Sequence, residues 1–222
     1  MPAVRRQFAP SMHALTFVII AIVLAASWVT WRLASRRTVL PCPAALSLLV
    51  EMENPLARVT RSECVIAQLG LGRGARVADI GCGPGRVSLP LAQTVGPEGE
   101  VFAVDLQEAM LAKVNARARD RNIANIRLWP ADARAPGLPA GSLDGAVAVM
   151  SLGEIPDLPV VFAAVHASLK PGGRFLVAES LFDPHFINRK KLTALAVAAG
   201  FTESHAVGNR LAYTIVFIRP MS

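Results

Sequence analysis

Apolar residues follow two different patterns along this chain. An uncharged, unbroken run occupies Ala14–Trp31, whereas from Thr60 onward short apolar runs alternate with segments of helical spacing. Strand-like and helix-like segments in alternation predict an open α/β sheet. The last two strands should form a hairpin, and residues 170–173 should form a turn. The expected strands are residues 76–80, 100–105, 126–130, 143–150, 174–179, 203–207 and 212–219, and the expected helices are residues 60–69, 86–94, 107–121, 159–169 and 190–199.

The N-terminal apolar run predicts a helix that crosses a membrane. At ~1.5 Å per residue, Ala14–Trp31 would span about 27 Å, close to the ~30 Å thickness of the hydrocarbon core. Trp28 and Trp31 lie near one end, where indole rings favour the interface. A cleaved signal peptide is the alternative, but the run exceeds the roughly 7–15 apolar residues of that class. We therefore expect a tail at residues 1–13 and a transmembrane helix at residues 14–34.

A juxtamembrane segment, residues 35–59, separates this helix from the expected sheet. Prolines bracket a short apolar helix, Ala44–Met52, which either packs on the core or lies over the bilayer surface or the mouth of a site. More arginines follow the membrane span than precede it, and this bias favours a cytoplasmic location for the C-terminal side. The sequence thus predicts a single-pass membrane protein with a cytoplasmic domain at residues 60–222.

Composition and charge exclude several classes of protein. A hydrophobic fraction of 53% excludes a disordered chain, and three widely spaced cysteines exclude a disulfide scaffold and a structural zinc site. The net charge is +7, but the basic residues are dispersed and only one tyrosine is present to stack on bases. The dispersion favours a basic, solvated surface, and no nucleic-acid partner is expected.

A glycine-rich stretch follows the first expected strand of the domain. Gly81, Gly83 and Gly85 allow a sharp turn and a close approach of backbone N–H groups to a ligand. A dinucleotide-binding loop has its third glycine one position later, where this chain has Arg86. Asp79, at the strand end, repels phosphate and suits a cationic or amino-bearing ligand. The loop therefore disfavours a pyrophosphate.

The second expected strand ends in an acid, Asp105. An acid at this place can accept hydrogen bonds from both hydroxyl groups of a ribose. It can instead cap the helix that is expected to begin near Gln107. The glycine loop and the acid occur together and in register, which favours the ribose role.

These residues resemble those of the class I S-adenosylmethionine-dependent methyltransferases. The matching segments occur in family order and cover the chain from Thr60 onward; they are VADIGCGPGR, AVDLQEAM, PADAR, LDGAVAVMSLGEI and LKPGGRFLVAE. The resemblance implies a Rossmann-like, seven-stranded methyltransferase sheet in which the last strand is antiparallel. It also implies that the cofactor is S-adenosyl-L-methionine.

The resemblance further assigns residues to each part of that cofactor. Those around the methionine part are Asp79, Gly81, Cys82, Gly83 and Gly85. Those around the adenosine are Asp105 at the ribose, Leu106 and Ala133 beside the adenine, and Asp132 at the adenine amino group, while Met150 or Ser151 lines the sulfonium.

Methyl transfer depends mainly on alignment of the reactants, although some acceptors also need a base. The candidates that we select as catalytic are His185, whose side-chain type titrates near neutrality, and Glu154. Structural roles for both, in hydrogen-bonded loops, remain open. Further acids and hydroxyl groups expected at the same sheet edge are Asp157, Asp183 and Tyr213. No residue pattern predicts a metal, and the Asn/Asp-Pro-Pro-aromatic motif of base-amine methyltransferases is absent.

The resulting hypothesis is methyl transfer to a small acceptor in the lipid phase or associated with a membrane. The pattern looks similar to bacterial members near the quinone and phospholipid methyltransferases. A soluble small-molecule acceptor is the first alternative. A nicotinamide-dependent oxidoreductase and a cofactor-binding module without turnover are the others.

Overall fold

The computed structural model describes residues 16–20, 22–23, 26–27, 29–30, 51–53, 55 and 57–221. The chain divides into two compact units, residues 1–38 and 39–222. In the first unit the described residues are helical and exposed. No helix among the described residues is both long and apolar enough to span a membrane. The expected tail at residues 1–13 lies outside the described residues, as do parts of the expected span at 14–34 and most of the expected helix at 44–52.

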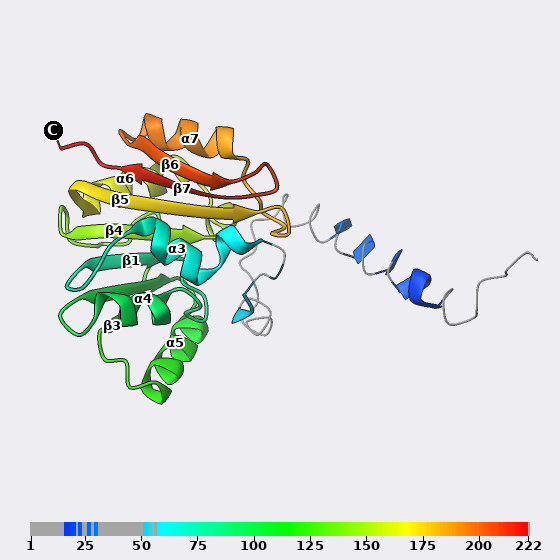
Figure 1. Cartoon of the computed structure of the whole chain (residues 1–222), viewed down its shortest axis with the longest axis horizontal. Coiled ribbons are helices and arrows are strands. Elements are labelled where there is room, and N and C mark those ends of the chain that lie inside the picture. Colours follow the sequence, from blue (N-terminus) through cyan, green and yellow to red (C-terminus); the bar gives the residue numbers. More distant parts are fainter. Residues whose placement is uncertain are drawn as a thin grey trace, which may run out of the picture. The chain divides into compact units, whose positions relative to one another are not determined.

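The second unit is built on one seven-stranded sheet (Figure 1). The strands lie in the order β3-β2-β1-β4-β5-β7-β6, and only β7 runs antiparallel to its neighbours β5 and β6. This arrangement confirms the expected seven-stranded, Rossmann-like sheet with its closing hairpin. The strands are β1 (Arg76–Ile80), β2 (Glu100–Asp105), β3 (Ile126–Pro130), β4 (Leu143–Val149), β5 (Leu169–Ser180), β6 (Thr202–Gly208) and β7 (Ala212–Ile218).

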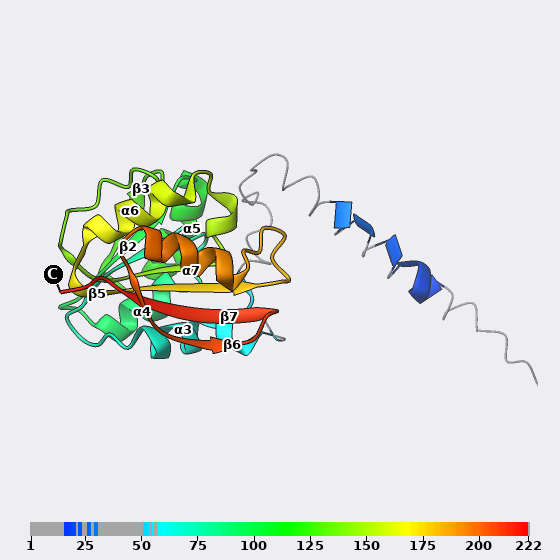
Figure 2. The same ribbon diagram turned by 90° about the horizontal axis from the view of Figure 1, so that it is seen from above.

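Helices cover both faces of the sheet. Figure 2 shows α6 and α7 on one side of the strands and α3 and α4 on the other. α5 packs on β2 and β3 beside α4, so it shares the face of α3 and α4. The helices are η2 (Arg58–Thr60), α3 (Ser62–Leu69), α4 (Ser88–Val95), α5 (Glu108–Asp120), η3 (Leu152–Glu154), α6 (Leu158–Ser168) and α7 (Arg189–Ala198).

Alternating side chains of the strands supply two apolar cores. On the face of α6 and α7, the rings of Phe162 and Phe175 meet edge to face with centroids 5.4 Å apart, and Phe201 packs beside both. On the face of α3 and α4, small aliphatic residues such as Val77 and Val147 are fully buried. Because the central strands are covered on both faces, their sequences are almost continuously apolar.

The prediction of a separate turn at residues 170–173 is wrong. β5 runs from Leu169 to Ser180 without a break, and its register against β4 shifts so that Leu143 faces Leu169 while Gly145 faces Arg174. The additional residues form a bulge, in which Gly172 adopts a left-handed backbone at φ +77°. A bulge absorbs the Pro-Gly-Gly segment without ending the strand, because the extra residues leave the ladder unpaired.

Candidate functional site

The parallel strands β1, β2, β3, β4 and β5 all have their carboxyl ends at one edge of the sheet. In open α/β sheets this edge is the place where ligands bind. The residues that the sequence nominates follow these strand ends, and the structure brings them to the same edge. They lie in the segments 79–86, 105–107, 132–134, 150–154 and 183–187.

The glycine loop after β1 is fixed to both neighbouring strands. The backbone N–H groups of Gly81 and Cys82 both donate to the carbonyl oxygen of Val104 in β2, at 2.8 and 3.0 Å. On the other side, the Ser151 hydroxyl after β4 donates to the Ile80 carbonyl at 2.7 Å. Burial raises the pKa of the Cys82 thiol well above its usual range, so this cysteine remains a neutral thiol.

Gly81 cannot be replaced without displacing its neighbours. Its backbone is left-handed, with φ +68°, and a Cβ atom built on it would lie 2.6 Å from the Cβ atom of Ser151. The sequence therefore needs glycine here for two independent reasons, conformation and space. The consequence is a close approach between the ends of β1 and β4.

Asp105 joins the end of β2 to this loop. One carboxylate oxygen, Oδ2, accepts from the N–H of Gly83 and the other, Oδ1, accepts from the N–H of Gln107, both at 2.9 Å. Gln107 is itself the N-cap residue of α5. The alternative in which Asp105 caps the helix is not observed, since a cap accepts from N–H groups inside the first turn. Next to it, Leu106 is 66% exposed and offers an apolar surface beside the acid.

Asp79 is held inside the domain and away from solvent. Its side chain accepts from the Ser88 hydroxyl at 2.6 Å, and only 2% of the residue is exposed. Burial is the main reason that its pKa rises from 3.8 to about 6, and the nearby Arg86 charge opposes the rise. Ser88, which the sequence analysis did not select, is the first residue of α4 and anchors this carboxyl group.

The two residues expected beside the adenine differ in their surroundings. Ala133 is buried, whereas Asp132 is partly exposed and pairs with Arg134, whose Nη2 lies 2.5 Å from its Oδ2. Hydrogen bonds from Arg134 lower the pKa of Asp132. An exposed ion pair of this kind contributes only about 0–1 kcal/mol, so a ligand can displace it at little cost. The sequence analysis missed Arg134 as a partner for Asp132.

The backbone reverses sharply where β4 ends. Met150 is one of the non-glycine residues with a left-handed backbone, at φ +53°, and its N–H donates to Ala178 in β5 at 2.9 Å. Ser151 follows it and is 9% exposed. A methionine in this conformation is uncommon and marks a constrained position next to the glycine loop.

The two candidate catalytic residues lie together. Nδ1 of His185 is 3.7 Å from Oε1 of Glu154 and 3.8 Å from Oδ1 of Asp183. The His185 side chain is only 5% exposed. Gly153 leaves no room for a Cβ atom against the His185 backbone carbonyl, so the loops after β4 and β5 pack directly on each other. Among the described residues, no group of three His, Cys, Asp or Glu side chains is arranged to hold a metal ion.

Two acids before the sheet pair with arginines at the glycine loop, one in the loop and one in α5, and the sequence analysis missed both. Glu53 pairs with Arg86 at 3.1 Å and Glu51 with Arg117 at 3.7 Å. Arg117 also donates to the Pro84 carbonyl within the loop, at 2.7 Å. The only available signal was the basic residue Arg86 at the position where a dinucleotide-binding loop has glycine.

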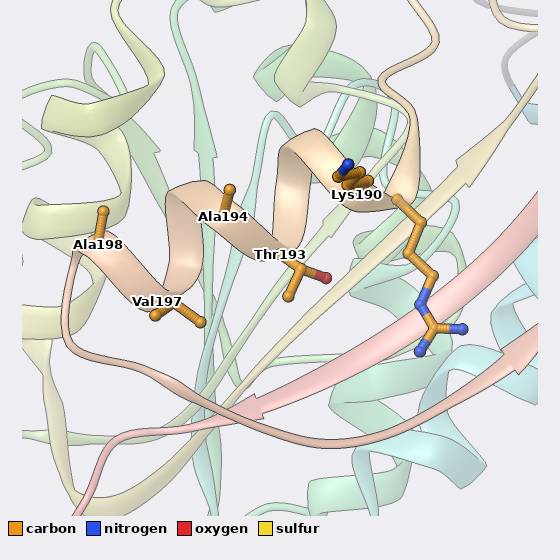
Figure 3. Close-up of a pocket in the computed structure, with 6 residues that line it drawn as sticks. Lys190, Thr193, Ala194, Val197 and Ala198 are labelled. Atoms are coloured by element: carbon orange, nitrogen blue, oxygen red, sulfur yellow. The ribbon is translucent and has the colours of Figure 1, made fainter.

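A separate open hollow lies along α7 (Figure 3). None of the site residues nominated from the sequence lines it. The close-up shows Lys190 at one end of the helix and Ala198 at the other. The lining residues are Arg189, Lys190, Thr193, Ala194, Val197 and Ala198.

Comparison with known proteins shows what this domain is similar to. Residues 77–173 match the family model described as a methyltransferase domain. The fold is that of an S-adenosylmethionine-dependent methyltransferase from Aquifex aeolicus, with a TM-score of 0.71 at 17% identity over 80% of this chain and 99% of that one. Residues 77–173 thus match a methyltransferase domain, and the sheet has the fold that an S-adenosylmethionine-dependent methyltransferase also has.

Two curated relatives are similar to the same region. Nocamycin O-methyltransferase from Saccharothrix syringae is 40% identical over 101 residues, which are 46% of this chain and 36% of that protein. Demethylmenaquinone methyltransferase from Geobacillus kaustophilus is 31% identical over 118 residues, 53% of this chain and 50% of that protein. The matched region thus spans no more than half the length of either relative.

Proposed function

We propose that this chain transfers a methyl group from S-adenosyl-L-methionine to a small acceptor in or at the lipid phase. The observation that carries the use of S-adenosyl-L-methionine is the hydrogen bond between Gly83 and Asp105. It joins the glycine loop to the acid of β2, within the region that matches a methyltransferase domain. Two observations support an acceptor in or at the lipid phase: the similarity to a demethylmenaquinone methyltransferase and the uncharged run Ala14–Trp31.

The residues at the sheet edge fit this cofactor. Asp105 has lone pairs beyond its two backbone contacts, so it can accept the ribose hydroxyl groups. The exposed Leu106 side chain offers an apolar face to the adenine, and Asp132 offers a carboxylate to the adenine amino group once Arg134 yields. Met150 and Ser151 border the glycine loop on the side of β4. The remaining residues proposed to surround the methionine part are Asp79, Gly81, Cys82 and Gly85.

When bound, S-adenosylmethionine supplies an activated methyl group. The protein has only to orient the acceptor toward this methyl group and to remove one proton from the acceptor. We assign proton transfer to His185, with the carboxylates of Glu154 and Asp183 beside Nδ1. Those carboxylates would stabilise the positive charge that the imidazole gains when it takes a proton from the acceptor. Because the His185 side chain is almost fully buried, bulk water competes little for this proton.

A membrane location follows as part of the same proposal. The run Ala14–Trp31 would tether the domain as a single-pass protein, with the methyltransferase domain in the cytoplasm. A tether holds the site in a thin layer beside the bilayer and so raises the effective concentration of a lipid-phase acceptor. A water-soluble acceptor is the alternative, in line with the similarity to nocamycin O-methyltransferase.

The test is methyl transfer from labelled S-adenosylmethionine into a total lipid extract, with identification of the labelled product. Reduced demethylmenaquinone in vesicles serves as a defined acceptor, because one relative is named for it. Label in the lipid fraction supports the proposal. Label only in water-soluble small molecules favours the alternative, and binding of the cofactor without any transfer would show a module that does not turn over.

A further inference from the structure

A buried acid and a buried tyrosine lie opposite each other at the end of the sheet. Glu179 in β5 and Tyr213 in β7 are paired residues of the antiparallel ladder, and each is 1% exposed. Glu179 stands last but one in a strand whose other inward-facing residues are apolar, where a charged residue is normally solvated. No role in cofactor contact follows from its place, so its burial needs another explanation.

Both side chains bind the backbone of the same residue. The N–H of Ile187 donates to Oε2 of Glu179 at 3.3 Å, and the Tyr213 hydroxyl donates to the carbonyl oxygen of Ile187 at 2.7 Å. A peptide segment held at its N–H and at its C=O has little freedom to rotate. Ile187 itself is 7% exposed and packs in the core under α7.

The segment held in this way carries His185. Upstream of Ile187, the N–H of Phe186 donates to the Asp183 carbonyl at 3.2 Å and the N–H of His185 donates to Asp183 Oδ1 at 2.6 Å. Downstream, the Asn188 side chain caps α7. The held residue therefore lies between the turn that presents His185 and the start of a helix.

The ionisation of the two side chains suits a permanent contact. Burial, followed by the nearby charge of Asp183, raises the pKa of Glu179 well above its usual range. Oε1 of Glu179 is buried without a hydrogen-bond partner, so a charged carboxylate in this place would lose its hydration without compensation at that oxygen. Burial also raises the pKa of Tyr213, so its hydroxyl keeps the proton that it donates.

We propose that Glu179 and Tyr213 are positioning residues, which together fix Ile187 and thereby hold the His185 imidazole beside Glu154. The inference rests on the proposed function, since it gives the histidine a role in proton transfer. It adds two residues that touch neither the acceptor nor the cofactor.

The experiment uses the full chain and two readouts. The first is the NMR titration of the His185 imidazole, identified by the signal that His185→Asn removes. The second is methyl transfer from labelled S-adenosylmethionine to reduced demethylmenaquinone in vesicles. The variants are Glu179→Met, which keeps bulk but removes the acceptor oxygen, and Tyr213→Phe, which keeps the ring beside Phe186.

Thr214→Val is the matched control. Thr214 is the next residue of β7 and is equally buried, and its hydroxyl donates to the Val59 carbonyl at 2.6 Å, in η2 on the α3 side. The Thr214→Val variant therefore loses one hydroxyl-to-carbonyl hydrogen bond from the same strand, and the contacts of Ile187 stay intact. Glu179→Gln restores an uncharged acceptor to the acid's position, and it should recover most of the turnover that Glu179→Met loses.

We expect Glu179→Met and Tyr213→Phe to move the His185 titration and to lower kcat about 10- to 100-fold, with unchanged affinity for S-adenosylmethionine. In a His185→Asn background the same changes should cost nothing further. Equal losses in that background, an equal effect of Thr214→Val, or an unmoved titration would overturn the proposal. If Glu179→Met does not fold, Tyr213→Phe decides.

The two proposals fail in different ways. A wild-type chain that transfers no methyl group defeats the proposed function, whereas the titration of His185 still reports whether the two residues position it. Active wild-type protein with an unmoved titration in both variants defeats only the positioning role.

Discussion

Asp105 accepts a hydrogen bond from the backbone N–H of Gly83 at 2.9 Å. Gly83 lies in the loop after β1, and Asp105 is the last residue of the neighbouring parallel strand β2. Their contact joins the glycine loop to the acid, two features that the sequence nominates separately. A carboxylate that is already fixed loses little freedom when a ribose binds. Its position is thus a property of the protein fold and not of the ligand.

We expect Asp105→Ala to weaken binding of S-adenosylmethionine by about 1–3 kcal/mol, the cost of losing charge-assisted hydrogen bonds to the ribose. The fold should survive with a lower melting temperature, because the N–H groups of Gly83 and Gln107 lose their acceptor. Titration calorimetry measures the affinity. Asp120→Ala, at an exposed acid ending α5, is the control and should bind as the wild type does. Unchanged affinity in Asp105→Ala would remove the ribose assignment.

Asp79→Asn should change the pH dependence of stability in a defined direction. The raised pKa means that Asp79 of the folded wild-type protein keeps its proton up to about pH 6, whereas in the unfolded chain it loses the proton near pH 4. The stability that protonated Asp79 contributes is therefore fully present below about pH 4 and is lost as the pH rises through about 6. The difference between 3.8 and about 6 corresponds to at most roughly 3 kcal/mol. Asparagine cannot ionise and can still accept from Ser88.

Urea unfolding at two pH values tests this. Near pH 4 the variant and the wild type should have similar free energies of unfolding, and near pH 7.5 the variant should be the more stable by about 1–3 kcal/mol. Arg86 retains its ion pair with Glu53 in both proteins. The same difference at both pH values would contradict the assigned cause, which is the burial of a charge.

Gly81→Ala should destabilise the domain more than Gly74→Ala does. Both glycines have left-handed backbones, at φ +68° and φ +80°, so both variants carry a conformational cost of about 1–2 kcal/mol. Only at Gly81 does the new Cβ atom meet another atom, Ser151 Cβ at 2.6 Å, whereas nothing lies within 4 Å at Gly74. Overpacking adds about 1–3 kcal/mol.

Adding Ser151→Gly to Gly81→Ala should recover part of the loss, because it removes the clashing atom. Denaturant midpoints give the comparison. If Gly74→Ala costs as much as Gly81→Ala, space at the end of β4 is not the reason for the glycine.

The strands of the core could be predicted closely from sequence, because continuous apolar runs bounded by glycine or proline leave little choice of position. β1, β2 and β3 have the expected bounds. α4 begins at Ser88, two residues later than expected, since the glycine loop continues through Arg86 and Val87. The bulge in β5 could not be predicted, because the Pro-Gly-Gly signal for a turn does not say whether the strand resumes its old register.

Side-chain partners were harder to predict than elements. His185 and Glu154 were selected independently, and nothing in the sequence said that their loops pack together through Gly153. From the sequence Glu179 is an ordinary strand end, because its burial depends on neighbours that are distant along the chain, such as Tyr213 in the paired strand β7. Contacts of this kind rest on long-range pairing, which local patterns do not contain.

The N-terminal region should matter most for an acceptor that is embedded in a bilayer. Removal of residues 1–40 should lower turnover of a bilayer-embedded acceptor about 10-fold or more, because the tether no longer concentrates the site beside the lipid. Affinity for S-adenosylmethionine should not change, since residues 39–222 form a compact unit of their own that contains the whole sheet edge. Turnover of the same acceptor in detergent should fall much less. Leu46→Asp with Leu49→Asp should reproduce part of the bilayer defect if the expected helix at 44–52 guides the acceptor. Equal losses in detergent and in liposomes would mean that the N-terminal region only targets the protein to a membrane, and that the methyl acceptor need not be a lipid.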